Sequence, residues 1–156
     1  MKKITLLLGI FLIAGALLAQ DGKAPLSKGE RQLNFGLGFN DWGLPVYAGM
    51  DFAVHDDVTV GPMINTVIGG NNAYLGIAGR GDYHFNRIIG IPSEFDFYAG
   101  ANVGVRMWFD EDNNSSNMSF GIQVGGRWYW SDQWALNLEL GGGTGFGTSL
   151  GVSMKL

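Results

Sequence analysis

Residues 120–130 read Phe-Gly-Ile-Gln-Val-Gly-Gly-Arg-Trp-Tyr-Trp and alternate between two kinds of side chain. A period of two is that of a β-strand whose two faces meet different surroundings. The stretch therefore predicts a strand with one large apolar face and one face of small, polar and charged residues. The apolar series is Phe120, Ile122, Val124, Gly126, Trp128 and Trp130, and the other series is Gly121, Gln123, Gly125, Arg127 and Tyr129.

Seven further stretches alternate in the same way, which brings the number of predicted strands to eight. Their connections are rich in Gly, Asn, Asp and Ser, the residues that favour turns. No apolar stripe of helical period follows residue 19, so the sequence predicts an all-β fold. The predicted strands are 32–40, 45–54, 58–68, 73–85, 95–109, 118–130, 134–141 and 146–156.

Every charged residue inside these strands lies on the face of small residues. In a soluble barrel the bulky apolar face would point inward, whereas in a membrane barrel it faces lipid and a narrow lumen accepts small side chains. The many glycines on the charged face favour the second arrangement, because in a lumen they leave room for Arg and Tyr. We therefore predict an eight-stranded antiparallel, up-and-down transmembrane β-barrel, closed because an open edge would leave backbone groups unpaired in lipid. The charged residues of the predicted lumen are Asp51, Arg80, Asp82, Asp96, Arg106, Arg127, Glu139 and Lys155.

The first residues have the features of a secretory signal peptide. Lys2 and Lys3 precede an apolar run from Ile4 to Leu18, and the small residue Ala19 follows. The run is shorter than the ~20 residues that a transmembrane helix needs. We predict a signal peptide over 1–19, a polar periplasmic tail over 20–31 and the barrel over 32–156. An even number of strands places both ends of the barrel on the periplasmic side.

Composition excludes several kinds of site. The formal net charge of −4 argues against a nucleic-acid partner, which would need a basic surface. Cysteine is absent, so the sequence offers neither a disulfide nor a lipid-modified cysteine. No metal-ligand spacing occurs, and we predict neither a metal site nor a cofactor.

Aromatic residues gather near the two ends of the predicted strands, where a membrane barrel carries aromatic girdles at its interfaces with water. The girdle predicted at the periplasmic end includes Phe52, Phe85, Phe97, Trp128, Trp130 and Trp134, with Tyr83 and Phe95 beside them, and the outer one includes Phe39 and Phe109.

With these features the chain resembles the small eight-stranded outer-membrane barrels of the OmpA/OmpX type over 32–156. Its last eight residues, Ser-Leu-Gly-Val-Ser-Met-Lys-Leu, are similar to the assembly signal of that family, which usually ends in an aromatic residue. The resemblance implies that Ser149, Gly151, Met154 and Leu156 are read by the barrel-assembly machinery. It also implies a monomer in the outer membrane of a Gram-negative bacterium, in contact with lipid and lipopolysaccharide.

Three local features depart from a regular barrel of this type. The predicted outer loops, 41–44, 69–72, 110–117 and 142–145, are short for the family. The periplasmic connection 86–94 is long where a tight turn is usual. Pro62 lacks the N–H that a ladder needs, and we predict a β-bulge there.

The eight charged residues of the lumen face form the main candidate site. They comprise four basic and four acidic side chains. We predict that they form an ion-pair network that plugs the barrel, because eight strands leave a lumen that side chains only just fill. The alternative is a narrow pore with a charged constriction.

We interpret four further motifs as parts of the barrel or its loops rather than as functional sites. The tripeptide Arg-Gly-Asp at 80–82 spells a cell-adhesion sequence, but within a strand its Arg and Asp point into the lumen. His55 and His84 lie near the periplasmic end, the wrong side for the chemistry of outer-membrane acyltransferases and lipases. We interpret the acidic stretch 110–112 as a solvated loop rather than a divalent-cation site, and 141–147 as a flexible loop that lacks a phosphate-binding Lys.

The sequence thus predicts a non-catalytic integral outer-membrane barrel with a role in envelope structure or surface interaction. Two alternatives stay open at this point: a narrow solute channel, and a secreted soluble β-barrel that binds an apolar ligand in its core.

Overall fold

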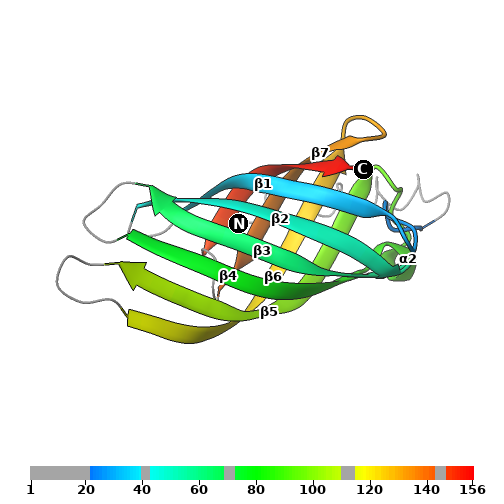
Figure 1. Cartoon of the computed structure of the whole chain (residues 1–156). Coiled ribbons are helices and arrows are strands. Elements are labelled where there is room, and N and C mark those ends of the chain that lie inside the picture. The colour runs from blue at the N-terminus through cyan, green and yellow to red at the C-terminus, as the bar shows by residue number, and fades with distance from the viewer. Residues whose placement is uncertain (1–21, 40–42, 69–72, 110–114, 143–146) are drawn as a thin grey trace, which may run out of the picture.

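The computed structural model describes residues 22–39, 43–68, 73–109, 115–142 and 147–156 (Figure 1). The predicted signal peptide and the acidic stretch 110–112 lie outside these ranges. The described part of the chain holds no helix with the length and apolar character needed to cross a membrane. Its elements are β1 (Arg31–Phe39), β2 (Leu44–His55), β3 (Val58–Ile68), β4 (Ala73–His84), α2 (Asn86–Ile89), β5 (Phe95–Phe109), β6 (Ser115–Tyr129), β7 (Trp134–Gly141) and β8 (Thr148–Lys155).

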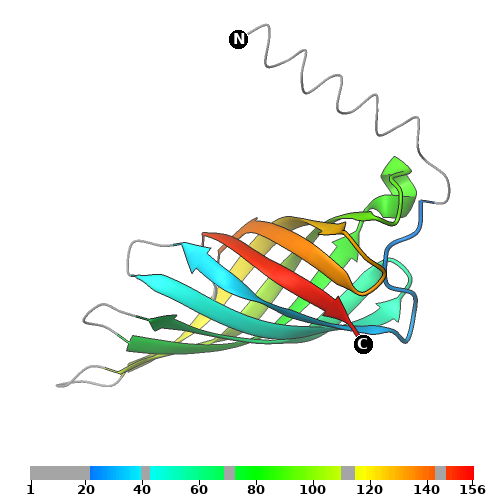
Figure 2. The same cartoon turned by 90° about the horizontal axis from the view of Figure 1, so that it is seen from above.

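The eight strands form one closed antiparallel barrel in chain order. Each strand pairs with the next, and β8 returns to pair with β1, from Gln32 opposite Lys155 to Phe39 opposite Thr148 (Figure 2). The predicted fold class is therefore confirmed. The strand boundaries differ mainly at β6, which begins at Ser115, so that three residues predicted as outer loop are strand.

The two faces of the wall point as the sequence predicts. On β6, Phe120 and Ile122 are 71% and 77% exposed on the outside, whereas Arg127 is 4% exposed in the lumen. On the other strands, large apolar residues such as Phe35, Ile77 and Leu138 are likewise exposed. The lumen face buries most of the charged residues, together with a few apolar ones such as Met63 and Val67. The alternative of a soluble barrel with an apolar core is therefore wrong, because the apolar side chains are not enclosed.

Glycine on the lumen face lets other groups approach the wall closely. A Cβ atom on Gly125 would overlap the ring of Tyr98, and one on Gly61 would overlap the backbone carbonyl of Met50. These positions cannot carry a side chain without a shift of their neighbours. The small residues of this face therefore make the space that the large lumen side chains occupy.

The bulge predicted at Pro62 is not found there. Gly49 pairs with Met63 and Phe52 pairs with Val60, which is the same alignment on both sides of the proline. The shift of register lies instead between Ala53 and His55, beside the turn to β3. A proline removes one donor from the ladder, and here the strands keep their alignment around the missing bond rather than insert a residue.

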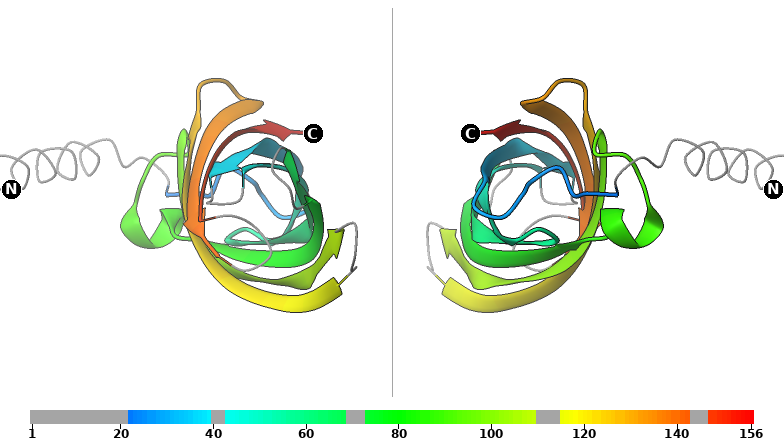
Figure 3. Two further views of the ribbon diagram at one scale, coloured as in Figure 1. Left: turned by 90° about the vertical axis from the view of Figure 1, so that its left-hand side faces the viewer. Right: turned by 90° about the vertical axis from the view of Figure 1, so that its right-hand side faces the viewer.

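One end of the barrel, where β1 begins and β8 ends, carries additional structure; we call it the termini end. The segment 22–30, predicted as a tail, is folded across this mouth (Figure 3). Leu26 is buried, the Gly29 N–H donates to the Ala53 carbonyl at 2.8 Å, and the Ala53 N–H donates to Glu30 at 3.0 Å. The long connection 86–94 contains α2, a single turn that the sequence does not predict, and it lies outside the ring of strands (Figure 3).

Candidate functional site

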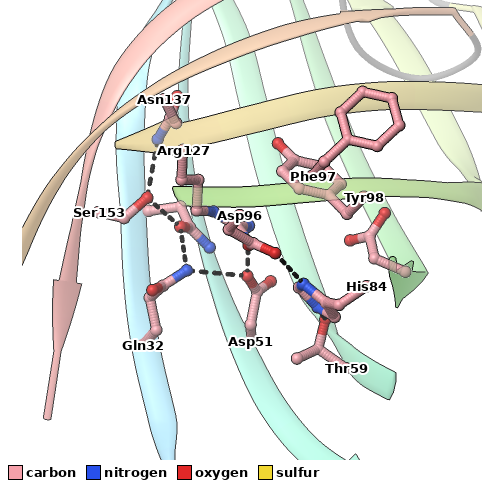
Figure 4. A network of polar contacts seen from close by, with 12 residues as sticks. Gln32, Asp51, Thr59, His84, Asp96, Phe97, Tyr98, Arg127, Asn137 and Ser153 are labelled. Atoms are coloured by element: carbon pink, nitrogen blue, oxygen red, sulfur yellow. Dashed lines mark hydrogen bonds and ion pairs between the residues drawn. The ribbon is translucent and has the colours of Figure 1, made fainter. Parts of the chain in front are cut away.

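The lumen at the termini end contains a buried cluster around Arg127. Its guanidinium lies between two carboxylates, with Nη2 2.8 Å from Asp51 Oδ2 and Nη1 2.8 Å from Asp96 Oδ2 (Figure 4). Asp96 is the cross-strand neighbour of Arg127 in the β5–β6 hairpin, whereas Asp51 comes from β2. We call these three residues, with His84, the Arg127 cluster.

His84 extends this cluster toward β3. Its Nδ1 atom is 2.7 Å from Asp96 Oδ1, and its Nε2 atom is 3.0 Å from the hydroxyl of Thr59 (Figure 4). The order of hydroxyl, imidazole and carboxylate is that of a hydrolytic triad. Thr59 and His84 are 1% and 2% exposed, however, so a substrate has no access to the hydroxyl.

A chain of neutral polar side chains continues from Asp51 around the wall. Gln32 Nε2 donates to Asp51 at 3.2 Å and to Asn34 at 3.0 Å, and the hydroxyl of Ser153 donates to Asn34 at 2.7 Å. Asn137 Nδ2 donates to Ser153 at 2.9 Å (Figure 4). These bonds join β2, β1, β8 and β7, so one network crosses the seam where the barrel closes.

A second cluster, the Arg80 cluster, lies around Arg80. The Arg80 guanidinium is 2.8 Å from Asp82 Oδ2 through Nε and 2.7 Å from Glu139 Oε2 through Nη2. Gln123 Nε2 donates to the other oxygen of Asp82 at 2.8 Å, and Asn102 Nδ2 donates to Gln123 at 2.8 Å. Because Glu139 is on β7 and Arg80 on β4, this contact spans the lumen from one wall to the other.

Tyr98 connects the two clusters. The Arg127 guanidinium carbon lies 4.2 Å from the centre of its ring, and that of Arg80 lies 5.8 Å away. The Tyr98 hydroxyl donates to Glu139 at 2.9 Å. The ring therefore keeps the two cations apart while its face attracts both, as cation–π geometry requires.

Six of the eight charged residues predicted for the lumen are in these clusters, three in each. Each cluster sets one guanidinium against two carboxylates. The other two predicted residues contact aromatic rings: the Arg106 guanidinium carbon lies 5.4 Å from the centre of Tyr74, and Lys155 Nζ lies 4.4 Å from that of Tyr129.

The remaining sequence motifs take the following places. Both charged residues of the Arg-Gly-Asp tripeptide belong to the Arg80 cluster and are buried. His55, the last residue of β2, is exposed, with Nδ1 3.8 Å from Asp57. Within the described ranges no three or more His, Asp or Glu side chains gather as they would around a metal ion.

The residues predicted as girdles and as assembly signal are placed but not tested by the structure. Phe39, Phe97, Phe109, Trp128 and Trp130 are exposed on the outside of the wall, and Phe52, Phe85 and Trp134 are half-buried. Phe85 lies 5.9 Å from Phe97 between ring centres, and Trp134 lies 6.4 Å from Phe35. In the C-terminal stretch, Ser149 and Gly151 face the lumen, Met154 is half-buried and Leu156 is exposed.

The sequence prediction did not assign four further side chains of the site. His84, Tyr98 and Gln32 complete the network, and Tyr129 donates a hydrogen bond from its hydroxyl to Gln32. His84, Tyr98 and Tyr129 lie at the same alternate positions as the charged residues of their strands, and Gln32 lies opposite Asp51 and Lys155 of the neighbouring strands. That parity was the available signal, because a polar residue on the lumen face has only other lumen residues to bond.

The fold and its lumen define the class: an eight-stranded transmembrane β-barrel with a charged interior and an apolar exterior. The N-terminal β-barrel domain of Pseudomonas aeruginosa OprF is similar in structure, with a TM-score of 0.66 and 15% identity over 84% of this chain and 100% of that one. A de novo designed transmembrane β-barrel gives a TM-score of 0.60 and 16% identity over 84% and 98% of the two chains. The outer-membrane protein Ail of Yersinia pestis, in a phospholipid nanodisc, gives 0.54 and 12% over 83% and 100%.

These similarities confirm the predicted resemblance to the small outer-membrane barrels at the level of the fold. The outer surface of this barrel exposes large apolar side chains, as a barrel surrounded by lipid does. No protein-family model matches the sequence, and no curated protein matches it.

Proposed function

We propose that this protein is a non-catalytic, non-conducting barrel of the outer membrane with a role in envelope structure or surface interaction. The observation that carries the proposal is the pair of clusters across the lumen, in which Asp51, Asp82 and Arg127 are 1%, 2% and 4% exposed. Side chains that are so enclosed favour a lumen filled by the protein over an aqueous path beside them.

The energetics of the lumen favour a permanent plug over a pore. A buried charge is costly unless it is paired and hydrogen-bonded. Both arginines meet two carboxylates each, and the network continues through neutral side chains into five or more strands. A mobile constriction would have to break several of these contacts at once. The segment 22–30, folded over the termini end, covers that mouth as well.

We propose that the protein is not an enzyme because the triad-like arrangement in the described part of the chain is buried. Thr59, His84 and Asp96 have the necessary order, but the hydroxyl faces the interior and binds the imidazole in a closed network. Among the described residues, no opening in the lumen leads a substrate to the Thr59 hydroxyl.

We also propose, from the sequence, that the chain is a monomer surrounded by phospholipid and lipopolysaccharide. Its C-terminal stretch is proposed to be recognised by the barrel-assembly machinery.

Conductance across a planar lipid bilayer tests the proposal. The folded protein, verified by a change of electrophoretic mobility on heating, should give no stable current steps. The double variant Arg80→Ala/Glu139→Ala removes the contact that spans the lumen and should be the first to conduct. Stable unitary currents from the wild-type protein would replace the proposed role with that of a narrow solute channel.

A further inference from the structure

The outer surface of the wall has a groove of about 380 Å³ near the termini end. It crosses β5, β6 and β7 in two rows of paired residues. The row nearer the end is Phe95, Trp128 and Leu136, and the deeper row is Phe97, Gly126 and Leu138. Ile91, from the connection that follows α2, lines the groove as well.

Gly126 makes the groove. It is flanked by Phe97 on one strand and Leu138 on the other, both large and about half exposed. A Cβ atom on Gly126 would meet its nearest neighbour, the Asp96 carbonyl oxygen, at 3.6 Å, an ordinary contact distance. The packing of the wall therefore does not require a glycine at this position. The space above Gly126, between Phe97 and Leu138, is open to the surroundings of the barrel.

The connection 86–94 contributes Ile91 to the lining of the groove. It lies outside the ring of strands, on the side of the wall away from the lumen (Figure 3). Ile88 and Ile89 of α2 are 66% and 51% exposed, although they are apolar and next to the charged Arg87. Apolar side chains beside a charged one at the rim of a transmembrane band are typical of a segment at the boundary between headgroups and acyl chains.

We infer that the groove binds one acyl chain of a phospholipid from the leaflet at the termini end. The groove is continuous with the lipid-facing surface of the barrel, so hydrocarbon already surrounds it. Asp96, Arg127 and Asn137 also line the groove, but their side chains bond one another and Ser153 in the lumen, so the side chains that face the groove are apolar. The backbone at its floor is used in the β5–β6–β7 ladder, so a peptide strand would find no partner there. An empty groove would lose dispersion contacts along its walls, whereas a flexible chain fills it.

Two lipid-facing glycines provide a matched test. Gly126→Leu fills the groove with the protein's own side chain. Gly79→Leu is the control, because Gly79 also faces outward, on β4, and a Cβ atom there would meet nothing within 4 Å. Each protein is reconstituted in vesicles of phosphatidylethanolamine and phosphatidylglycerol, extracted in mild detergent and analysed by native mass spectrometry for retained phospholipid.

The wild type and Gly79→Leu should each retain one phospholipid, and Gly126→Leu should retain at least tenfold less. Ile91→Ser, which replaces an apolar lining residue without adding bulk, should also lower retention and serves if the leucine variant does not fold. The inference is overturned if the wild type retains no phospholipid, if Gly126→Leu and Ile91→Ser retain as much as the wild type, or if Gly79→Leu loses as much as they do. Retention of lipopolysaccharide in preference to phospholipid, in parallel vesicles, would overturn the assignment of the leaflet. The result does not depend on conductance, so it stands or falls separately from the proposed function.

Discussion

Gly125 and Gly126 are neighbours on one strand, yet the barrel uses them in opposite ways. Gly125 faces the lumen, where a Cβ atom would overlap the ring of Tyr98. Gly126 faces outward, where a Cβ atom has its nearest contact at 3.6 Å. The inner face of the wall is thus filled to contact by its own side chains, whereas the outer face leaves its gaps to the surrounding lipid.

This difference shows which face of the wall determines a single arrangement of the side chains. The core of a soluble protein is apolar and close-packed, whereas the close-packed interior of this barrel is largely polar. Its uniqueness comes from directional contacts such as those of Arg127, because ion pairs and hydrogen bonds tolerate few alternative arrangements. The apolar face needs only bulk and hydrophobicity, since lipid adapts to its shape.

The largest expected effect is on the inner face. Arg127→Met should leave Asp51 and Asp96 buried without their cation, and breaking a buried pair in this way costs about 3–5 kcal/mol of unfolding free energy. Urea unfolding in detergent, followed by tryptophan fluorescence, measures the loss. Arg31→Met removes an arginine that is exposed at the start of β1 and should change stability little. Equal losses for the two variants would show that Arg127 contributes no more than a surface charge.

The paired glycines sharpen the comparison directly. Gly125→Ala should displace Tyr98 and weaken its contacts with both arginines, and overpacking of this kind costs about 1–3 kcal/mol. Gly126→Ala should lie within about 0.5 kcal/mol of the wild type, as is usual for substitutions away from packed features. The same urea titration compares them. If the two variants unfold together, the contrast between the faces is wrong.

The smallest expected effect is at the rim, in the segment 22–30. The Lys28 N–H donates to the Asp56 carboxylate at 3.0 Å, and this bond lowers the pKa of Asp56 below its ordinary value of 3.8. At neutral pH the Asp56 carboxylate is ionised, and its bond to the Lys28 N–H holds the segment 22–30 in place. The bond is lost when the carboxylate is protonated, as the pH falls through the lowered pKa of Asp56. Asp56→Ala should raise hydrogen exchange of the Lys28 amide several-fold at pH 7, measured by NMR in micelles. Asp132→Ala, in the β6–β7 turn, is the control and should leave that amide unchanged.

Sequence alternation predicts which face each side chain takes, but not which partner it meets. Asp96 and Arg127 are opposite each other in a hairpin, so their contact follows from local register. The contact between Arg80 and Glu139 joins strands on different sides of the lumen, and its formation depends on the tilt and stagger of the closed barrel. No local pattern encodes that stagger, so the division into two clusters could not be predicted.

The termini end was the least predictable part of the fold. α2 has four residues, too few for a helical period to appear in the sequence. The docking of Leu26 depends on contacts with other parts of the chain, since its neighbours within 22–30 give no strand or helix pattern. The groove likewise arises from the register of three strands, because only pairing brings Gly126 between Phe97 and Leu138.

The pairing of β1 with β8 sets a condition on how the protein is made. These strands lie at opposite ends of the chain, and the Ser153 hydroxyl bonds Asn34 across 119 positions. A ribosomal product that stops before Thr148 keeps two bare edges, and hydrocarbon offers no substitute for their missing partners. Entry into the bilayer must therefore wait for the last strand, so a nascent chain has to be kept unfolded until its synthesis is finished.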